Sequence, residues 1–159
     1  MRKVNPEYAK AIMAIANRAP YLKLLGMKIC EKYKEKPDIC NAVDSLNNPF
    51  ASVHGGVFSS ILDTATFWAL YCCIGEEDGI TTLDLQVNNL AAAACGKIIA
   101  EGRLIRMGRT IGLAEGTLKD ENGRLLVQGT SKMFVLPGLQ SIDKVADRVG
   151  FETLPPKFL

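Results

Sequence analysis

The hydrophobic residues of this chain are concentrated in one long segment, which runs from Val57 to Ile74. Apolar side chains fall on nearly every side of a helix drawn through it. Such a helix must be enclosed by the rest of the fold. Its length would also suit a membrane span, but polar residues interrupt it at Ser59, Ser60, Asp63, Thr64 and Thr66. We therefore predict the central helix of a soluble domain.

The second half of the chain has the alternating pattern of β-strands. Asn122-Gly123 is a strong signal for a hairpin turn. Small residues at Gly112, Ala114 and Gly116 share one face of their strand, where the apolar helix is expected to approach closely. The pattern predicts strands at residues 82–88, 97–106, 110–119 and 124–135.

The first half predicts an amphipathic helix over Pro6–Arg18, followed by two strands, Leu25–Tyr33 and Ile39–Ser45. The elements together predict an antiparallel sheet with one apolar helix inserted before its third strand. A strongly curved sheet is what encloses such a helix. The tail, residues 137–159, carries a short predicted helix at Ile142–Val149 and has no assigned function.

Length and composition narrow the class of protein. The chain has 159 residues, which predicts one domain. Its net charge of +2 and the absence of a basic stripe argue against nucleic-acid binding. The N-terminus has no segment that resembles a signal peptide. Its five cysteines include no Cys-x-x-Cys pair, which argues against a zinc site or a disulfide framework and favours a cytoplasmic location.

The candidate chemistry begins just before the apolar helix, at His54, Gly55 and Gly56. The first turn of a helix has free N–H groups and the positive end of the helix dipole, so it attracts an anion or an oxyanion. Asp63 lies inside the helix, where a carboxylate needs a partner. The same residues are also consistent with purely structural roles: a tight turn at the two glycines, packing of His54, and a hydrogen-bonding partner that satisfies Asp63.

Helix geometry limits how these residues can cooperate. Gly55 and Asp63 are eight residues apart, which is about 12 Å along a helix. A base or nucleophile must come within about 3 Å of the reacting group. If both are catalytic, Asp63 of one protomer must face Gly55 of another. The sequence then predicts a dimer with active sites at its interface.

At this point the chain resembles the hotdog-fold acyl-CoA thioesterases, in particular the branch typified by the phenylacetate-pathway thioesterase. The matching motif is Asn48-x5-His54-Gly55-Gly56-x6-Asp63, and the likeness covers about residues 20–136. Further matching segments are Thr82–Leu85, Arg106–Arg109 and Leu125–Thr130. The resemblance implies an α+β hotdog fold: a long central helix wrapped by a curved, six-stranded antiparallel sheet, in a single domain spanning 1–159.

The resemblance also implies roles for the motif residues. The N–H of Gly55 polarises the thioester carbonyl, and Asp63 of the opposing protomer attacks that carbonyl or activates a water. Asn48 and His54 position the water or the thioester, and the Thr82 hydroxyl orients the carboxylate or the water. No metal or redox cofactor is expected, because a thioester is already activated.

Substrate binding is expected from further residues. Gly56 lies beside Gly55 at the helix start, and Phe58, Phe67 and Trp68 are candidates for the lining of the acyl pocket, although aromatic residues of a helix more often belong to the core. Cationic groups are expected near the phosphates of coenzyme A. The candidates are Arg106, Arg109 and Lys132, each of which also fits the solvated edge of a strand.

Two other functions remain open. A dehydratase or hydratase acting on acyl thioesters uses the same fold, and a non-catalytic acyl-CoA-binding protein needs no turnover. The expected partners are an acyl-CoA and a second copy of the chain, and neither nucleic acid nor membrane; the sequence leaves open whether dimers pair further into tetramers. One departure from relatives is Ala51, where glycine is common, so the loop before His54 is expected to differ in shape.

Overall fold

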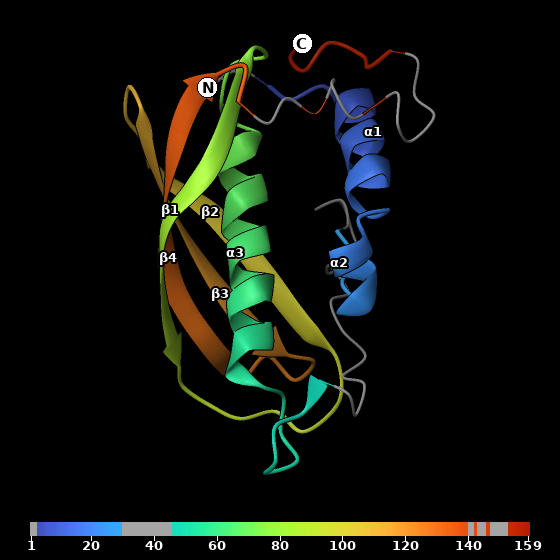
Figure 1. Cartoon of the computed structure of the whole chain (residues 1–159), viewed down its shortest axis with the longest axis vertical. Helices are drawn as coiled ribbons and strands as arrows, with labels where there is room; N and C mark the ends of the chain where they lie inside the picture. The colour runs from blue at the N-terminus through green and yellow to red at the C-terminus, as the bar shows by residue number, and fades with distance from the viewer. Residues whose placement is uncertain (1–2, 30–45, 140–141, 143–145, 147–152) are drawn as a thin grey trace.

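The structure is a computed structural model that describes residues 3–29, 46–139, 142, 146 and 153–159 (Figure 1). These residues form three helices and four strands. In chain order they are α1 (Pro6–Ala16), α2 (Pro20–Leu24), α3 (Gly55–Tyr71), β1 (Asp78–Asn89), β2 (Ile98–Met107), β3 (Ile111–Asp120) and β4 (Leu125–Pro137). The predicted central helix and the four strands of the second half are thus confirmed.

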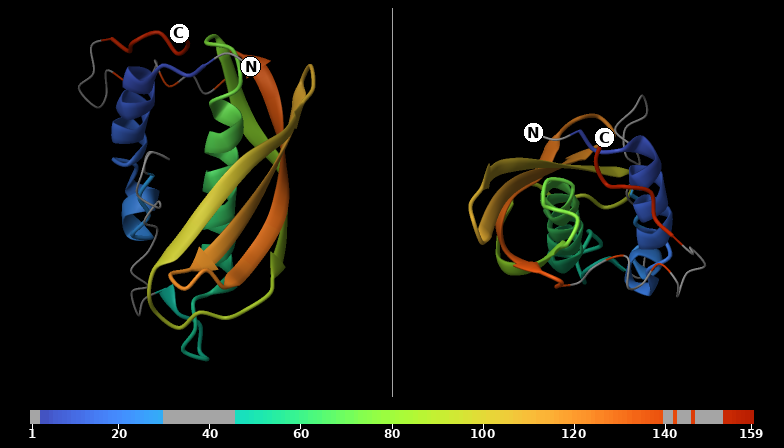
Figure 2. Two further views of the ribbon diagram at one scale, coloured as in Figure 1. Left: turned by 180° about the vertical axis from the view of Figure 1, so that it is seen from behind. Right: turned by 90° about the horizontal axis from the view of Figure 1, so that it is seen from above.

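The four strands form one antiparallel sheet in the order β1-β4-β3-β2. The sheet curves around α3, which lies along its concave face (Figure 2). The predicted hairpin between β3 and β4 turns at Gly123, whose φ of 83° is in the left-handed region that suits glycine. The arrangement is the predicted one of a curved sheet wrapped around a single apolar helix.

The described residues contain four strands rather than the expected six. The expected strand Ile39–Ser45 lies outside the described residues, as does the second half of Leu25–Tyr33. Residues 25–29 are described and form no strand. Leu25 caps α2, and both backbone groups of Ile29 bond to the side chain of Asn17 rather than to another strand.

Close contact between α3 and the sheet depends on glycines of the strands. A methyl group on Gly102 would overlap the backbone carbonyl of Ala65 in α3, and one on Gly112 would overlap Leu70. Gly116 and Gly129 likewise leave space for Leu62 of α3. The predicted small face of β3 therefore lies against the helix, as expected.

α1 and α2 lie on the side of α3 that is away from the sheet (Figures 1 and 2). Pro6 begins α1, and the Asn5 side chain caps it by accepting a hydrogen bond from the N–H of Glu7. Tyr8, Ile12 and Ile15 are buried on one face of α1 and belong to the core cluster that contains the C-terminal part of α3. The predicted amphipathic helix is confirmed, although it ends at Ala16. None of the helices in the described ranges is long and apolar enough to cross a membrane.

The tail places a buried lysine at the C-terminal end of α3. Lys157 is 2% exposed, and its Nζ donates a hydrogen bond to the carbonyl of Tyr71 at 2.8 Å. Burial lowers the pKa of this amine. A cation here also meets the negative end of the helix dipole. An antiparallel β-bridge joins Val4 to Phe158. Together with the contact of Lys157, this bridge places the described N-terminal and C-terminal segments beside the end of α3. Of the predicted helix Ile142–Val149, only residues 142 and 146 are described.

We expect Gly102→Ala to lower the free energy of unfolding by about 3 kcal/mol, because overpacking a close helix–sheet contact costs about this much. Urea unfolding followed by circular dichroism measures the change. Glu101→Ala is the control, since Glu101 precedes Gly102 on β2 but is exposed. Equal stability of the two variants would contradict the proposed close contact.

We expect Lys157→Ala to lower the free energy of unfolding by about 2 kcal/mol, since it leaves the carbonyl of Tyr71 buried without this donor. The same unfolding experiment applies. Lys10→Ala removes an exposed lysine that pairs with Glu7, and its effect should stay within about 0.5 kcal/mol. An unchanged stability in Lys157→Ala would show that the hydrogen bond from Lys157 to the carbonyl of Tyr71 does not stabilise the fold.

Candidate active site

The start of α3 combines a capping histidine with an unengaged backbone donor. His54 is the N-cap residue, and its Nδ1 accepts a hydrogen bond from the N–H of Gly56 at 2.9 Å. Gly55 is the first residue of the helix. No residue that the structure describes accepts a hydrogen bond from the N–H of Gly55. This N–H is therefore the donor that the helix start offers to a ligand, whereas that of Gly56 serves the cap.

A hollow of about 310 Å³ lies beside Gly55, between the start of α3 and the end of β1. Phe58 is 3% exposed and contributes to both this hollow and the core. The other two candidate aromatics, Phe67 and Trp68, pack with Tyr71 and lie, partly buried, against a different core cluster. The hollow is lined by Asn48, Ser52, Val53, Gly55, Phe58, Asn89, Leu90, Ala91 and Ala92.

Asn48 shapes the loop that leads to His54. Its Oδ1 accepts hydrogen bonds from the N–H of Phe50 and from the N–H and hydroxyl of Ser52. Within this loop Ala51 has a φ of 56°, a conformation that glycine adopts at lower cost. The loop thus holds the conformation that suits a glycine at position 51, although this chain carries alanine there. That this loop differs in shape from the loops of relatives stays a prediction.

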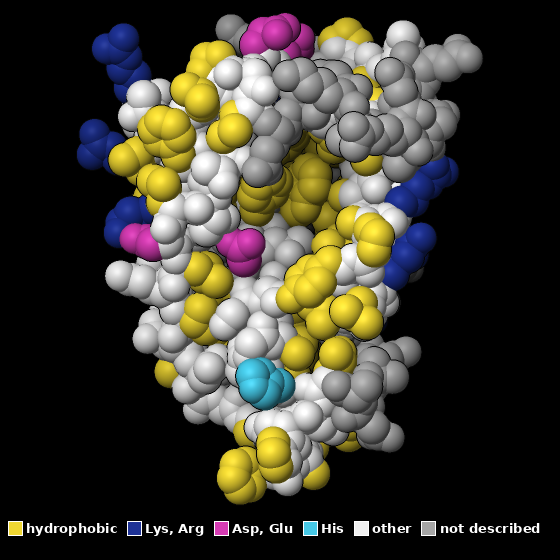
Figure 3. All heavy atoms as spheres, in the orientation of Figure 1, with side chains coloured by type: hydrophobic (Ala, Val, Ile, Leu, Met, Phe, Trp, Pro, Cys, Tyr) yellow, Lys and Arg dark blue, Asp and Glu magenta, His cyan; other side chains and the backbone are white. Residues whose placement is uncertain are grey.

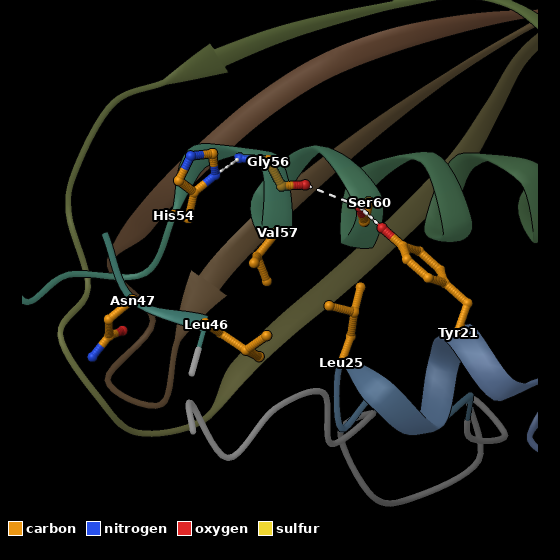
Figure 4. Close-up of a pocket in the computed structure, with 8 residues that line it drawn as sticks. All are labelled: Tyr21, Leu25, Leu46, Asn47, His54, Gly56, Val57 and Ser60. Atoms are coloured by element: carbon orange, nitrogen blue, oxygen red, sulfur yellow. Dashed lines mark hydrogen bonds between the residues drawn. The ribbon is translucent and has the colours of Figure 1, made fainter. Parts of the chain in front are cut away.

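A second hollow, of about 370 Å³, lies on the α2 side of the helix start (Figure 4). Leu25, Leu46 and Val57 form its apolar middle. The hydroxyl groups of Tyr21 and Ser60 are hydrogen-bonded at 2.8 Å at one end. His54, the only histidine of the chain, is exposed on the face shown in Figure 3. Together with the hollow beside Gly55, this second hollow leaves open space on two sides of the first turn of α3.

Asp63 is partnered by Thr82. The hydroxyl of Thr82 donates a hydrogen bond to Oδ1 of Asp63 at 3.0 Å. The hydroxyls of Ser59 and Thr66, on the same helix, donate to the helix backbone instead: Ser59 to the carbonyl of Gly55, and Thr66 to that of Leu62. The structure thus brings together the two residues that were expected to act as carboxylate and orienting hydroxyl.

Gly55 and Asp63 lie on one unbroken helix, which keeps them about 12 Å apart along its axis. They do not meet within one protomer. Thr82 lies on β1, at one edge of the described sheet, next to a register irregularity between Thr82 and Asp84. Asp63 is therefore held next to an edge strand.

The three candidate cations do not lie near Gly55 in the same protomer. Arg106 is exposed near the end of β2, and Arg109 in the turn that follows. This end of the sheet faces Leu70, about 22 Å along α3 from Gly55. Lys132 lies on the outer face of β4, where its amine pairs with Asp84 and lowers the pKa of that carboxyl group.

Sequence reasoning missed three residues near the helix start: Tyr21, Ser60 and Asn89. Asn89 ends β1, and its Nδ2 lies 3.1 Å from the position of a methyl group on Gly55.

Among the described residues, no three His, Cys, Asp or Glu side chains are grouped to hold a metal ion. Cys72, Cys73 and Cys95 are free thiols, and burial raises the pKa of Cys72.

Curated relatives match parts of this chain. A Haemophilus influenzae protein provisionally named an esterase is 30% identical over 77 residues, which cover 48% of this chain and 56% of that protein. Acyl-coenzyme A thioesterase 13 of Mus musculus is 22% identical over 119 residues, covering 74% and 75% of the two chains. The chain spans about half the length of the first two curated relatives, 56% and 42%.

Solved structures show the same fold over more of the chain. A thioesterase family protein from Silicibacter pomeroyi is 25% identical with a TM-score of 0.71, covering 82% of this chain and 99% of that one. A Bacillus halodurans protein solved with CoA is 21% identical with a TM-score of 0.67, covering 82% and 86%.

A thioesterase-like protein from Ralstonia eutropha, related to phenylacetic acid degradation, is 24% identical with a TM-score of 0.67, covering 80% of this chain and 98% of that one. Residues 50–127, which include His54, Gly55, Asp63 and Thr82, match the thioesterase superfamily. The segment that carries the candidate motif is therefore similar in sequence to the thioesterase superfamily, and the fold is the hotdog fold of these solved structures.

Proposed function

We propose that this protein is an acyl-CoA thioesterase, which hydrolyses an acyl- or aryl-CoA to the free acid and coenzyme A. The observation that carries the proposal is the unengaged N–H of Gly55 at the mouth of a hollow, in a segment that matches the thioesterase superfamily. Two similar proteins support the substrate class: the mouse relative is named an acyl-coenzyme A thioesterase, and the Bacillus halodurans structure contains CoA.

In the proposed reaction, the N–H of Gly55 polarises the carbonyl group of the thioester. It donates to the carbonyl oxygen of the thioester and, together with the helix dipole, stabilises the negative charge that develops there. His54 contributes by capping Gly56, which fixes the first turn and leaves the adjacent donor to the substrate. Asn48 contributes by holding the loop that forms one wall of the hollow.

The Asp63 carboxylate is the base. It takes a proton from a water whose oxygen adds to the carbonyl carbon, and the tetrahedral intermediate then expels the thiolate by breaking the C–S bond. The proton passes to the leaving sulfur, so the products are a carboxylic acid and free CoA thiol. The hydrogen bond from Thr82 keeps one carboxylate oxygen in a fixed position.

The site requires two copies of the chain, because Gly55 and Asp63 are too far apart on α3 to serve one carbonyl. The dimer we propose places Asp63 of each protomer opposite Gly55 of its partner. β1 is at an edge of the described sheet and carries Thr82, the partner of Asp63. Dimers that associate further are compatible with this arrangement. Arg106, Arg109 and Lys132 remain predicted contacts of the CoA phosphates.

We expect Asp63→Asn to lower the rate of hydrolysis at least a hundredfold, because it removes the proton acceptor. The side chain is partly buried and its replacement is isosteric, so thermal stability should change little. The measurement is thiol release from a panel of aryl- and fatty-acyl-CoAs, with a colorimetric thiol reagent. Glu121→Gln, an exposed carboxylate in the β3–β4 turn, is the control and should match the wild type.

Wild-type turnover in Asp63→Asn would refute the role of this carboxylate. Two other outcomes would replace the proposed function itself. Binding of acyl-CoA without thiol release across the panel would indicate a binding protein. Formation of a hydrated or unsaturated acyl-CoA, again without thiol release, would indicate a hydratase or dehydratase of the same fold.

A further inference from the structure

Asn89 brings a side-chain amide next to the backbone donor of Gly55. It is the last residue of β1 and lines the hollow that contains Gly55. Its Nδ2 lies 3.1 Å from the position that a β-carbon on Gly55 would occupy. Asn89 is exposed, and no described residue is hydrogen-bonded to its side chain. An uncommitted N–H₂ group therefore lies close to Gly55, at the hollow that both residues line.

Covalent geometry bounds the distance between these two donors. The backbone N and the β-position of a residue are about 2.5 Å apart, given bond lengths near 1.5 Å and a tetrahedral angle. Adding the 3.1 Å contact gives at most about 5.6 Å between the N of Gly55 and Nδ2 of Asn89. One oxygen that accepts from two donors at about 2.9 Å each allows a separation of up to about 5.8 Å. The separation of the two donor atoms therefore allows one carbonyl oxygen to lie within hydrogen-bond distance of both.

A second donor has a clear use at this position. A carbonyl oxygen has two lone pairs, and the oxyanion formed from it carries a full charge that a single N–H satisfies only in part. Active sites of acyl transfer commonly pair a backbone N–H with a side-chain amide for this purpose. Gly55 also fits this arrangement as a glycine, because a larger residue would crowd Nδ2 of Asn89.

We propose that the side-chain amide of Asn89 donates the second hydrogen bond to the thioester carbonyl oxygen that the N–H of Gly55 binds. Asn89 is then a catalytic residue in contact with the substrate, and it belongs to the same protomer as Gly55. The inference rests on the proposed thioesterase function. Because the negative charge on this oxygen grows in the transition state, the contact acts mainly on kcat rather than on KM.

Two substitutions at Asn89 test whether its side chain acts as a hydrogen-bond donor or only fills space. Asn89→Ala removes the amide, and we expect kcat for thiol release to fall about a hundredfold with KM changed less than about threefold. Asn89→Asp keeps the shape but presents an oxygen that accepts and carries negative charge, so its kcat should fall further than that of Asn89→Ala. The acyl-CoA hydrolysed fastest by the wild type is the substrate.

Asn88→Ala is the matched control, since Asn88 is the preceding exposed residue of β1 and its amide faces Gln128 instead. It should retain the wild-type kcat. Unchanged kcat in Asn89→Ala, or equal activity of Asn89→Asp and wild type, would overturn the inference while leaving the thioesterase function intact. Melting curves of both variants within about 3 °C of wild type would show that the loss is catalytic. Absence of thiol release by the wild type would instead overturn the proposed function, and the inference with it.

Discussion

The close contact of α3 with the concave face of the sheet is the constraint on which the candidate site depends. Gly102, Gly112, Gly116 and Gly129 let the helix approach until its side chains touch strand backbone. The same contact fixes the rotation of the helix about its axis, so that Asp63 faces Thr82 of β1. It also fixes the start of the helix beside the end of β1, where Gly55 meets Asn89. One packing contact thus positions both parts of the proposed chemistry.

The same helix also separates those parts. An α-helix is rigid, and eight residues of it keep Gly55 and Asp63 about 12 Å apart. In the proposed mechanism, the helix start of each protomer supplies donors for an oxyanion, and the middle of the helix supplies a carboxylate held by a hydroxyl. Neither half is a hydrolytic site alone. In the proposed dimer, two copies place complementary halves together to form such a site, so the proposed activity and the proposed assembly depend on each other.

Much of this architecture follows from local sequence patterns. The apolar run predicted α3, alternation predicted the strands, and the small residues of β3 predicted the close helix contact. The residues that escaped prediction come together only through tertiary structure. Asn89 follows no motif, and Lys157 meets Tyr71 across 86 positions of the chain. The side chain of Asn17 replaces a strand partner at Ile29. The cationic candidates Arg106, Arg109 and Lys132 follow mainly from their charge, and charge does not tell where a side chain lies.

The most direct test of the central claim is activity in mixed dimers. Asp63→Asn removes the base, and Gly55→Pro removes the donor, since proline has no N–H and is tolerated as the first helical residue. His54 already has the extended backbone that precedes proline. Each variant alone should be inactive. After the two are mixed and dimers re-form, differently tagged heterodimers should release thiol at up to about half the wild-type rate, because one of their two sites is intact. Confirmed heterodimers without activity would contradict a site shared between protomers.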